Sequence, residues 1–360
     1  MRLPMTIIFK TSFGTIDYRP VLLVKVTDEQ GRVGLGESSL LDMPISEHET
    51  TEKAIRLFEK HVIPKILGRS FSSIRPLYVL CAKEFVHYPV TMTGMESAFL
   101  HLFAQQQNIP FSTIFGGRKK KVLIGMSIGI QPTRKDLYRA IQQSVDQGYG
   151  RIKIKIEPGY DVDVLHDVRT KFPDICLSVD ANAAYRREHF SLLEGLDVFH
   201  LAMVEQPFAE KALSLHAKLQ RRIKTPICLD ESAHDLASTK QAIFMGAGKI
   251  VNIKPARVGG YRIAKQIHDF CQKRHVPCWV GGRLESGLGS LFNLAFATLP
   301  NITLASEMLP SFSFLKKDIL AKSIPFKQGF MSFPVLSHGK ISLNEEVIKK
   351  YTVYQRSFTL

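Results

Sequence analysis

The sequence predicts an α/β fold: a (β/α)7β TIM-like barrel with an α+β capping domain. Strand-like segments precede helical ones in the first third of the chain, whereas short apolar runs alternate with amphipathic segments afterwards. The polar residues that close five successive runs lie 25, 25, 25 and 24 residues apart. A repeat of this length holds one buried strand, one crossover helix and two short loops, so it predicts parallel strands closed into a barrel.

The N-terminal part of the chain shows strand patterns followed by helix patterns. Residues 12–36 are expected to form a hairpin, in which the turn DEQGR (28–32) joins the strands VLLVKV and VGLGE. A three- or four-stranded sheet fits this segment. Apolar residues at helical spacing predict helices over 49–67 and 94–107. This α+β domain is expected to end near residue 120, after the GGRKKK stretch.

The barrel strands are expected in eight apolar runs, which are separated by seven helical intervals. An open doubly wound sheet is the alternative, but no GxGxxG follows the first run to support dinucleotide binding. The runs are VLIGMSIG (122–129), RIKIKI (151–156), CLSVDA (176–181), AMVEQP (202–207), ICLDES (227–232), IVNIKP (250–255), CWVGG (278–282) and ITLAS (302–306).

The RIKIKI run alternates charged and apolar residues with a period of two. An edge strand would expose Lys153 and Lys155 to water, which is the common arrangement for such a strand. In a barrel, however, Ile152, Ile154 and Ile156 must pack against the surrounding helices, and the two lysines then face the interior near the C-terminal mouth. Buried lysines must be neutral or paired with anions.

Three carboxylates supply anions at the same mouth. Asp180, Glu205 and Asp230 each close a run, so they are expected to converge at one rim of the barrel. A single strand-terminal Asp is more often the N-cap of the next helix than a metal ligand, but the regular series of placements favours a shared site. Clustered carboxylates repel one another unless a cation is present, and an all-oxygen site favours Mg²⁺, with Mn²⁺ able to substitute.

Lys254 closes the run after Asp230 and is expected to lie across the barrel from Lys155. Two lysines on opposite sides of a metal ion are suited to moving the proton next to a carboxylate. The metal ion and Lys153 would hold the carboxylate oxygens, where negative charge accumulates after the carbon loses its proton. The sequence therefore predicts a small anionic carboxylate substrate, Lys155 and Lys254 as catalytic residues, and Lys153 as a substrate-binding residue.

Taken together, the motifs resemble those of the enolase superfamily, in its muconate-lactonising subgroup. The longer phrases IKIKIEPGYD and VGGRLESGLG are most similar to the o-succinylbenzoate synthase / N-acylamino acid racemase family, and the similarity covers nearly the whole chain. The motifs are KIK (153–155), DAN (180–182), VEQP (204–207), LDES (229–232) and IKPARVGG (253–260).

The resemblance implies a capping domain of residues 1–120, completed by 311–360, and a barrel of residues 121–310 that holds Mg²⁺ on the three carboxylates. It also implies dehydration of a succinyl-hydroxycyclohexadiene carboxylate in menaquinone biosynthesis. Lys155 would remove the α-proton and then protonate the departing hydroxide, while Lys254 stays cationic. The alternatives are an N-acylamino acid racemase, in which both lysines exchange protons on opposite faces, and a dipeptide epimerase.

Several neighbouring residues are further candidates. Asn182 follows Asp180 on the same rim, where its amide would hold a metal-bound water or the substrate, although an ordinary loop asparagine is an equal alternative. Arg257 is expected to act as a cation near Lys254, and the family similarity supports its assignment to substrate binding. The region 286–287 is a candidate for contacts with the substrate carboxylate.

The family resemblance implies that two N-terminal segments close over the mouth. SFGTID (12–17) is expected to be a mobile loop, which Gly14 permits. In LLDMPISEHE (40–49), the family resemblance leads us to expect an aromatic residue soon after the proline, but Ile45 and Ser46 stand there. This departure leaves the acyl-side pocket, and hence the substrate preference, open.

The net charge of +15 raises the alternative of a non-catalytic polyanion-binding protein. The cations are scattered, however, and no basic helix with interleaved aromatics occurs, so no nucleic-acid partner is expected. No apolar run approaches the length of a membrane span and no signal-peptide pattern occurs, which predicts a cytoplasmic protein without a membrane partner. Five cysteines without CxxC spacing argue against disulfides and a zinc site. Assembly into a homo-oligomer is left open.

Overall fold

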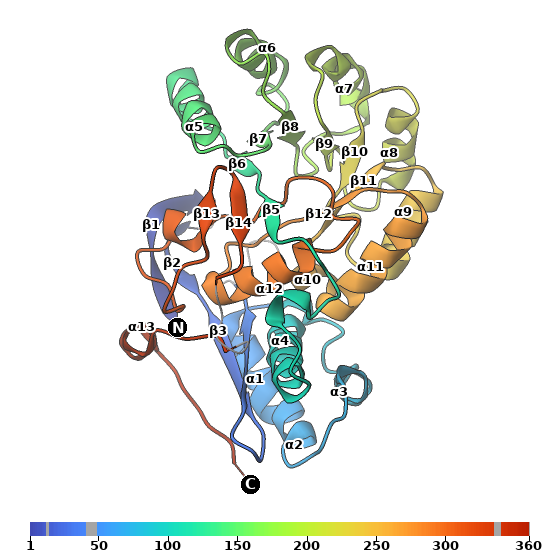
Figure 1. Cartoon of the computed structure of the whole chain (residues 1–360). Coiled ribbons are helices and arrows are strands. Elements are labelled where there is room, and N and C mark those ends of the chain that lie inside the picture. The colour runs from blue at the N-terminus through green and yellow to red at the C-terminus, as the bar shows by residue number, and fades with distance from the viewer. Residues whose placement is uncertain (12–13, 41–48, 335–339, 360) are drawn as a thin grey trace.

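The computed structural model describes residues 1–11, 14–40, 49–334 and 340–359. Within these ranges, seven parallel strands form one curved sheet in the order β12-β11-β10-β9-β8-β7-β6 (Figure 1). The strands are β6 (Met126–Ile128), β7 (Ile152–Lys155), β8 (Leu177–Asp180), β9 (Val204–Glu205), β10 (Ile227–Leu229), β11 (Ile250–Ile253) and β12 (Cys278–Val280).

Residues 302–307 take the eighth position and close the barrel. On one side, this segment forms parallel bridges with Cys278 and Gly281 at β12, and on the other side with Ile124 just before β6. Backbone hydrogen bonds on both sides complete the ring. The predicted (β/α)7β barrel and the position of its eighth run are therefore confirmed.

One expected strand is divided between two sheets. The run 122–129 supplies β5 (Lys121–Leu123), which pairs with a C-terminal strand, and then β6 of the barrel. Ile124 lies at the division, because its N–H donates to the Gly329 carbonyl while its own carbonyl accepts from Gly150. The backbone thus passes from one sheet to the next at this residue.

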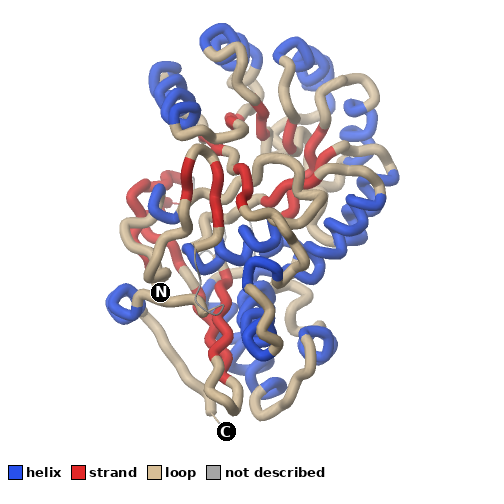
Figure 2. The backbone as a smooth tube through the Cα atoms, viewed as in Figure 1, coloured by secondary structure: helices blue, strands red, loops and turns tan. Residues whose placement is uncertain are grey.

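Helices occupy all seven expected intervals and surround the strands, as Figure 2 shows. Their apolar faces pack on the sheet, as in α5, where Leu137 and Ile141 are buried. The elements are α5 (Arg134–Asp146), α6 (Val162–Lys171), the 3₁₀ turn Arg187–His189, α7 (Phe190–Gly195), the 3₁₀ turn Leu196–Phe199, α8 (Leu213–Gln220), α9 (Leu236–Phe244), α10 (Pro255–Val258), α11 (Tyr261–Lys273) and α12 (Gly287–Ala297).

The N-terminal capping region combines strands and helices, as predicted. The expected hairpin is β3 with β4, and the two expected helices are observed, the first with a π-helical turn inside it. The elements are β1 (Arg2–Thr11), β2 (Gly14–Pro20), β3 (Leu22–Thr27), β4 (Val33–Ser38), α1 (Thr51–Leu57), the π turn Phe58–Val62, α2 (Ile63–Ile66), α3 (Ile74–Cys81), α4 (Pro89–Gln106) and the 3₁₀ turn Phe111–Thr113.

Two expectations for this region are corrected. The described strands form two separate pairs, β1 with β2 and β3 with β4, rather than one sheet of three or four strands. Pro20, which has no N–H to donate, ends β2. The segment 14–17 belongs to β2 rather than to a loop, because its pairing with β1 continues as far as Thr11 and Gly14. Residues 12–13 lie outside the described ranges.

The C-terminal segment returns to the N-terminal region. Leu315 forms an antiparallel bridge with Met5 of β1, and Arg356 pairs with Glu59 in the π turn. The division at residue 120 and the assignment of 311–360 to the capping domain stay predictions. The elements are the 3₁₀ turn Ser311–Ser313, β13 (Phe326–Lys327), β14 (Phe330–Ser332) and α13 (Glu345–Tyr351).

Two buried glutamates join the capping region to the barrel. Glu37 in β4 accepts hydrogen bonds from the amides of Ser286 and Gly289 at the start of α12, and Glu96 in α4 accepts from the first two amides of α11. Unpaired N–H groups and the helix dipole favour carboxylates at helix N-termini. These contacts hold the capping region against α11 and α12 of the barrel.

In the described ranges, no helix is long and apolar enough to span a bilayer.

Candidate active site

Strand β7 places two lysines inside the barrel. Side chains alternate along a strand, and Ile152 and Ile154 pack in the main hydrophobic core, so Lys153 and Lys155 lie on the inner face. Lys153 is buried, whereas Lys155 is partly exposed at the C-terminal end of the strand.

Three carboxylates lie beside these lysines on the next strands. Asp180 ends β8 and Glu205 ends β9, and parallel pairing sets Asp180 between Lys155 and Glu205. Asp230 directly follows the last residue of β10. All three carboxylates are buried. The regular spacing in the sequence thus corresponds to neighbouring positions at one end of the barrel.

The Lys153 ammonium lies among carboxylates. Its Nζ is 2.6 Å from Glu205 Oε2, 2.7 Å from Glu307 Oε2 and 3.2 Å from Asp180 Oδ2. Glu205 accepts a hydrogen bond from this ammonium, and Glu307 and Asp180 form ion pairs with it. Burial acts to lower the pKa of Lys153, but the surrounding carboxylates raise it well above its ordinary value. Lys153 is therefore held as a cation.

Lys155 has an aspartate and an asparagine as partners. Its Nζ is 2.7 Å from Asp180 Oδ2 and also donates to Asn182 Oδ1. Asn182 in turn donates its side-chain amide to Glu231 at 3.2 Å and its backbone N–H to Asp180 at 3.0 Å. Its φ of 40° is left-handed, a conformation that asparagine tolerates better than most residues. The structure thus places Asn182 where it orients Lys155.

Lys254 and Arg257 share Asp230 on the other side of the site. Lys254 Nζ is 2.7 Å from Asp230 Oδ2, and Arg257 forms an ion pair with Asp230 Oδ1. The short helix α10 begins directly after Lys254, and its first turn brings Arg257 back to the same carboxylate. Arg257 is therefore a buried ion-pair partner rather than a surface arginine.

The carboxylates differ in their pKa values because their charged neighbours differ. Burial acts to raise the pKa of each, but Lys153 and Lys155 lower that of Asp180. Arg257 and Lys254 lower the pKa of Asp230. For Glu205, burial and the neighbouring Asp180 outweigh Lys153 and raise the pKa to about 7.

The chemistry of these donors fits a hard divalent cation. In the described ranges, no three His, Cys, Asp or Glu side chains surround a common point at which an ion could bind. The carboxylate oxygens instead contact lysine ammonium groups and Arg257. The donor set is nevertheless three buried carboxylates without sulfur or imidazole, the type that Mg²⁺ prefers. Burial and the neighbouring Asp180 raise the pKa of Glu205, and a bound cation would favour its charged form.

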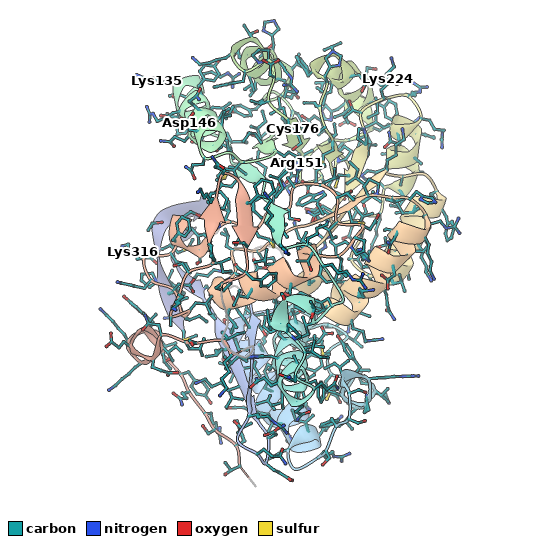
Figure 3. The ribbon with its side chains drawn as sticks, in the orientation of Figure 1. Lys135, Asp146, Arg151, Cys176, Lys224 and Lys316 are labelled. Atoms are coloured by element: carbon teal, nitrogen blue, oxygen red, sulfur yellow. The ribbon has the colours of Figure 1, made fainter. Side chains whose placement is uncertain are left out.

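Sequence reasoning missed two residues at this site. Glu307 contacts Lys153 and pairs with Arg151 at 3.1 Å; Figure 3 labels Arg151. Glu307 directly follows the eighth apolar run, so the rule that found the other carboxylates would have found it. Asn252 contacts Glu205 and Asp230 and lies two residues before Lys254, on the same face of β11.

Other expected positions have different surroundings. Ser286 is buried, and both its amide and its hydroxyl donate to Glu37, so it belongs to the contact between capping region and barrel. The expectation of an acyl-side pocket near Ile45 and Ser46 concerns residues 41–48, which lie outside the described ranges.

Comparisons with known families match both parts of the chain. Residues 136–339 match the family described as enolase C-terminal domain-like, and residues 2–116 match the N-terminal domain of mandelate racemase / muconate lactonizing enzyme. An o-succinylbenzoate synthase of Geobacillus kaustophilus is 38% identical, covering 97% of this chain and 93% of that protein. An N-succinylamino acid racemase of Thermus thermophilus is 36% identical, covering 99% and 96%.

Solved structures give the same result. An enolase-superfamily member from Enterococcus faecalis V583 is 35% identical, with a TM-score of 0.91 over 98% of this chain and 96% of that one. Muconate lactonizing enzyme from Pseudomonas putida, at 19% identity and a TM-score of 0.88 over 97% and 96%, shares the fold. The chain therefore belongs to the enolase superfamily, within the family of o-succinylbenzoate synthases and N-succinylamino acid racemases.

Proposed function

We propose that this chain is an o-succinylbenzoate synthase, which removes water from 2-succinyl-6-hydroxy-2,4-cyclohexadiene-1-carboxylate to give 2-succinylbenzoate. The observation that carries the proposal is the placement of Lys155 at the end of β7 and Lys254 directly after β11, each partly exposed and each 2.7 Å from a buried aspartate. Curated relatives of this name match nearly the whole chain.

Asp180, Glu205 and Asp230 would hold Mg²⁺, and Mn²⁺ would substitute for it. When bound, the ion offsets the negative charge that collects on the substrate carboxylate oxygens. The buried Lys153 ammonium adds a permanent positive charge beside Glu205 and Asp180. The three carboxylates and Lys153 thus form one end of the proposed site.

The two partly exposed lysines have different roles in the proposed reaction. Lys155, as a neutral amine, takes the proton from the carbon next to the substrate carboxylate, and the electron pair of the C–H bond moves toward the carboxylate. The same ammonium then gives that proton to the departing hydroxyl group, so that the C–O bond breaks and water leaves. Lys254 stays protonated, and its charge stabilises the electron-rich substrate. Asn182 keeps the Lys155 amine directed by accepting a hydrogen bond from it.

Arg257 has a supporting place in this scheme. It neutralises Asp230 together with Lys254, so it affects Lys254 through their shared carboxylate. We propose this indirect role for Arg257 in addition to the substrate contact expected from the sequence.

The test is incubation of the purified protein with the cyclohexadiene substrate and Mg²⁺, with aromatisation followed by absorbance. Formation of 2-succinylbenzoate that requires both the enzyme and the divalent ion is the expected result. Absence of aromatisation at any practical enzyme level would reject the assignment.

Racemisation of N-succinylamino acids is a second candidate, because Lys155 and Lys254 have similar partners, similar distances and partial exposure. One amine on each face of the substrate is the arrangement that proton exchange at a stereocentre needs. Uptake of deuterium from solvent into N-succinylamino acids, faster than the dehydration, would favour it. Dipeptide epimerisation is less supported, because a relative named hydrophobic dipeptide epimerase is only 26% identical to this chain.

The same proposal includes a role in menaquinone biosynthesis, a cytoplasmic location and a small carboxylate as the ligand, with assembly into a homo-oligomer left open. The alternative of polyanion binding is less supported, because the cations are scattered along the sequence without a basic helix that carries interleaved aromatics.

A further inference from the structure

Asn252 is a buried amide between two carboxylates of the proposed ion site. Its Nδ2 lies 2.8 Å from Glu205 Oε1 and 2.9 Å from Asp230 Oδ1. Both of these atoms can only accept hydrogen bonds when ionised, so the NH₂ end of the amide must face them. One side chain thus connects carboxylates from two neighbouring strands, β9 and β10.

The two oxygens of each carboxylate have different partners. Asn252 holds Oε1 of Glu205 and Oδ1 of Asp230, whereas lysine ammonium groups contact Oε2 and Oδ2. Arg257 adds a second donor to Asp230 Oδ1, and it also donates a hydrogen bond of 2.9 Å to the backbone carbonyl of Asn252. The rotation of each carboxylate is therefore fixed, and one oxygen of each stays directed toward the cationic centre of the site.

Stability alone does not account for Asn252. Its Oδ1 atom is buried without a hydrogen-bond partner among the described residues, and such an acceptor destabilises a fold. The neighbouring strand also leaves room for it: a Cβ on Gly281 would collide with Asn252 Oδ1 and lie 2.8 Å from Lys254 Cε. A glycine at this close approach preserves the positions of both side chains.

We infer that Asn252 is a positioning residue for the cation site, which holds Glu205 and Asp230 so that each offers a single oxygen to the ion. The inference rests on the proposed function, because it takes these carboxylates as ligands. Partners that orient metal ligands by hydrogen bonds commonly contribute about ten- to a hundredfold to metal affinity. Asn252 is a neutral residue, so it orients the carboxylates without adding a further negative charge.

The test measures Mn²⁺ binding directly, by loss of the electron paramagnetic resonance signal of free Mn²⁺, in the full-length protein. Asn252→Ala is expected to raise the Mn²⁺ Kd by about ten- to a hundredfold. The turnover of the variant relative to wild type is expected to be higher at saturating Mn²⁺ than at low Mn²⁺. A purely structural defect would not produce this dependence on Mn²⁺. Circular dichroism checks that the variant is folded, and Asn252→Ser replaces it if it is not.

Asn293→Ala is the matched control. Asn293 is also a buried asparagine with one amide atom lacking a partner among the described residues, but it bonds to Tyr261 in the helix layer. Its substitution is expected to leave the Mn²⁺ Kd unchanged. If wild-type protein binds no Mn²⁺ that Mg²⁺ can displace, the proposed cation site fails; if wild type binds Mn²⁺ and the Asn252 variant binds it equally well, only the role of Asn252 is overturned.

Discussion

Three lysines of the site differ in how far their side chains reach solvent. The exposed fraction is 5% for Lys153, 30% for Lys155 and 22% for Lys254. Lys153 is surrounded by three carboxylates, whereas the other two amines lie at the open end of the barrel. The position of each lysine along the barrel therefore decides its role. Lys153 is a buried fixed charge, whereas Lys155 and Lys254 can contact a substrate.

Lys155→Ala is expected to lower kcat for dehydration by about 10²- to 10⁴-fold, because it removes the proposed general base. Asp180 keeps Lys153 as a partner, so the variant should remain folded. Steady-state kinetics and circular dichroism check the two parts. Lys135→Ala, at an exposed position on α5, is the control. Near-native turnover of the Lys155 variant would show that another group is the base.

At the scale of single residues, spacing alone located the main charged groups. Asp180, Glu205 and Asp230 could be predicted because each closes a strand, and closure of strands in register places them together. Asn252 could not be predicted, because its importance depends on which atoms of two other strands it meets. A contact of that kind leaves no periodic signal in the sequence.

At the scale of elements, the eighth barrel position is built by a segment that forms only isolated bridges to its neighbours. It nevertheless carries Glu307, which contacts Lys153 at 2.7 Å and Arg151 at 3.1 Å. Through these two cationic partners, Glu307 ties the segment to β7 and to the residue just before that strand. The element therefore contributes charge to the site as well as closing the ring.

Glu307→Gln is expected to lower the free energy of unfolding by about 3 kcal/mol, since it leaves Arg151 and Lys153 with less compensation for their burial. Urea denaturation measures the change. Glu194→Gln, which breaks the more exposed ion pair with Arg222, should cost less than about 1 kcal/mol. Equal effects of the two substitutions would contradict the structural importance assigned to the eighth segment.

Element types were predictable where periodicity was strong, as in RIKIKI and in the helix over 94–107. The division of 122–129 between two sheets was not, because the partner of β5 comes from β14 at the other end of the chain. Neither pattern nor propensity reports which distant strand will pair with a short apolar run.

At the scale of the whole molecule, capping region and barrel meet through buried carboxyl groups. Glu96 in α4 accepts hydrogen bonds of 2.5 and 2.8 Å from the amides that begin α11. Burial raises the pKa of this carboxyl from 4.5 to about 7, against the hydrogen bonds that favour its charged form. Tyr78 on α3 and Arg262 on α11 face the same group. The contact between the two regions therefore contains a group that titrates near neutral pH.

Between about pH 4.5 and 7, the folded protein binds a proton at Glu96 more tightly than the unfolded chain does. The contribution of Glu96 to the free energy of unfolding should consequently fall as pH rises through this window, by about 3 kcal/mol in total. Glu96→Gln lacks this titration, so the difference in stability between wild type and variant should change with pH.

Urea denaturation of both proteins at several pH values across the window measures this difference. Glu52→Gln, at an exposed position on α1, should show a constant difference from wild type. A constant difference for Glu96→Gln as well would contradict the raised pKa.

The architecture as a whole could be predicted because barrel periodicity is long and regular. The substrate preference could not, because the expected acyl-side pocket concerns residues 41–48, which lie outside the described ranges.

The antiparallel bridge between Met5 and Leu315 has a consequence for synthesis of the protein. Backbone hydrogen bonds extend it on both sides, from Thr6 to Phe314 and from Lys316 to Pro4. A ribosome releases the first strand early, but its partner emerges only when most of the polypeptide has been made. One edge of β1 therefore stays unpaired through nearly all of translation. A chain truncated before Phe314 has no partner segment for that edge.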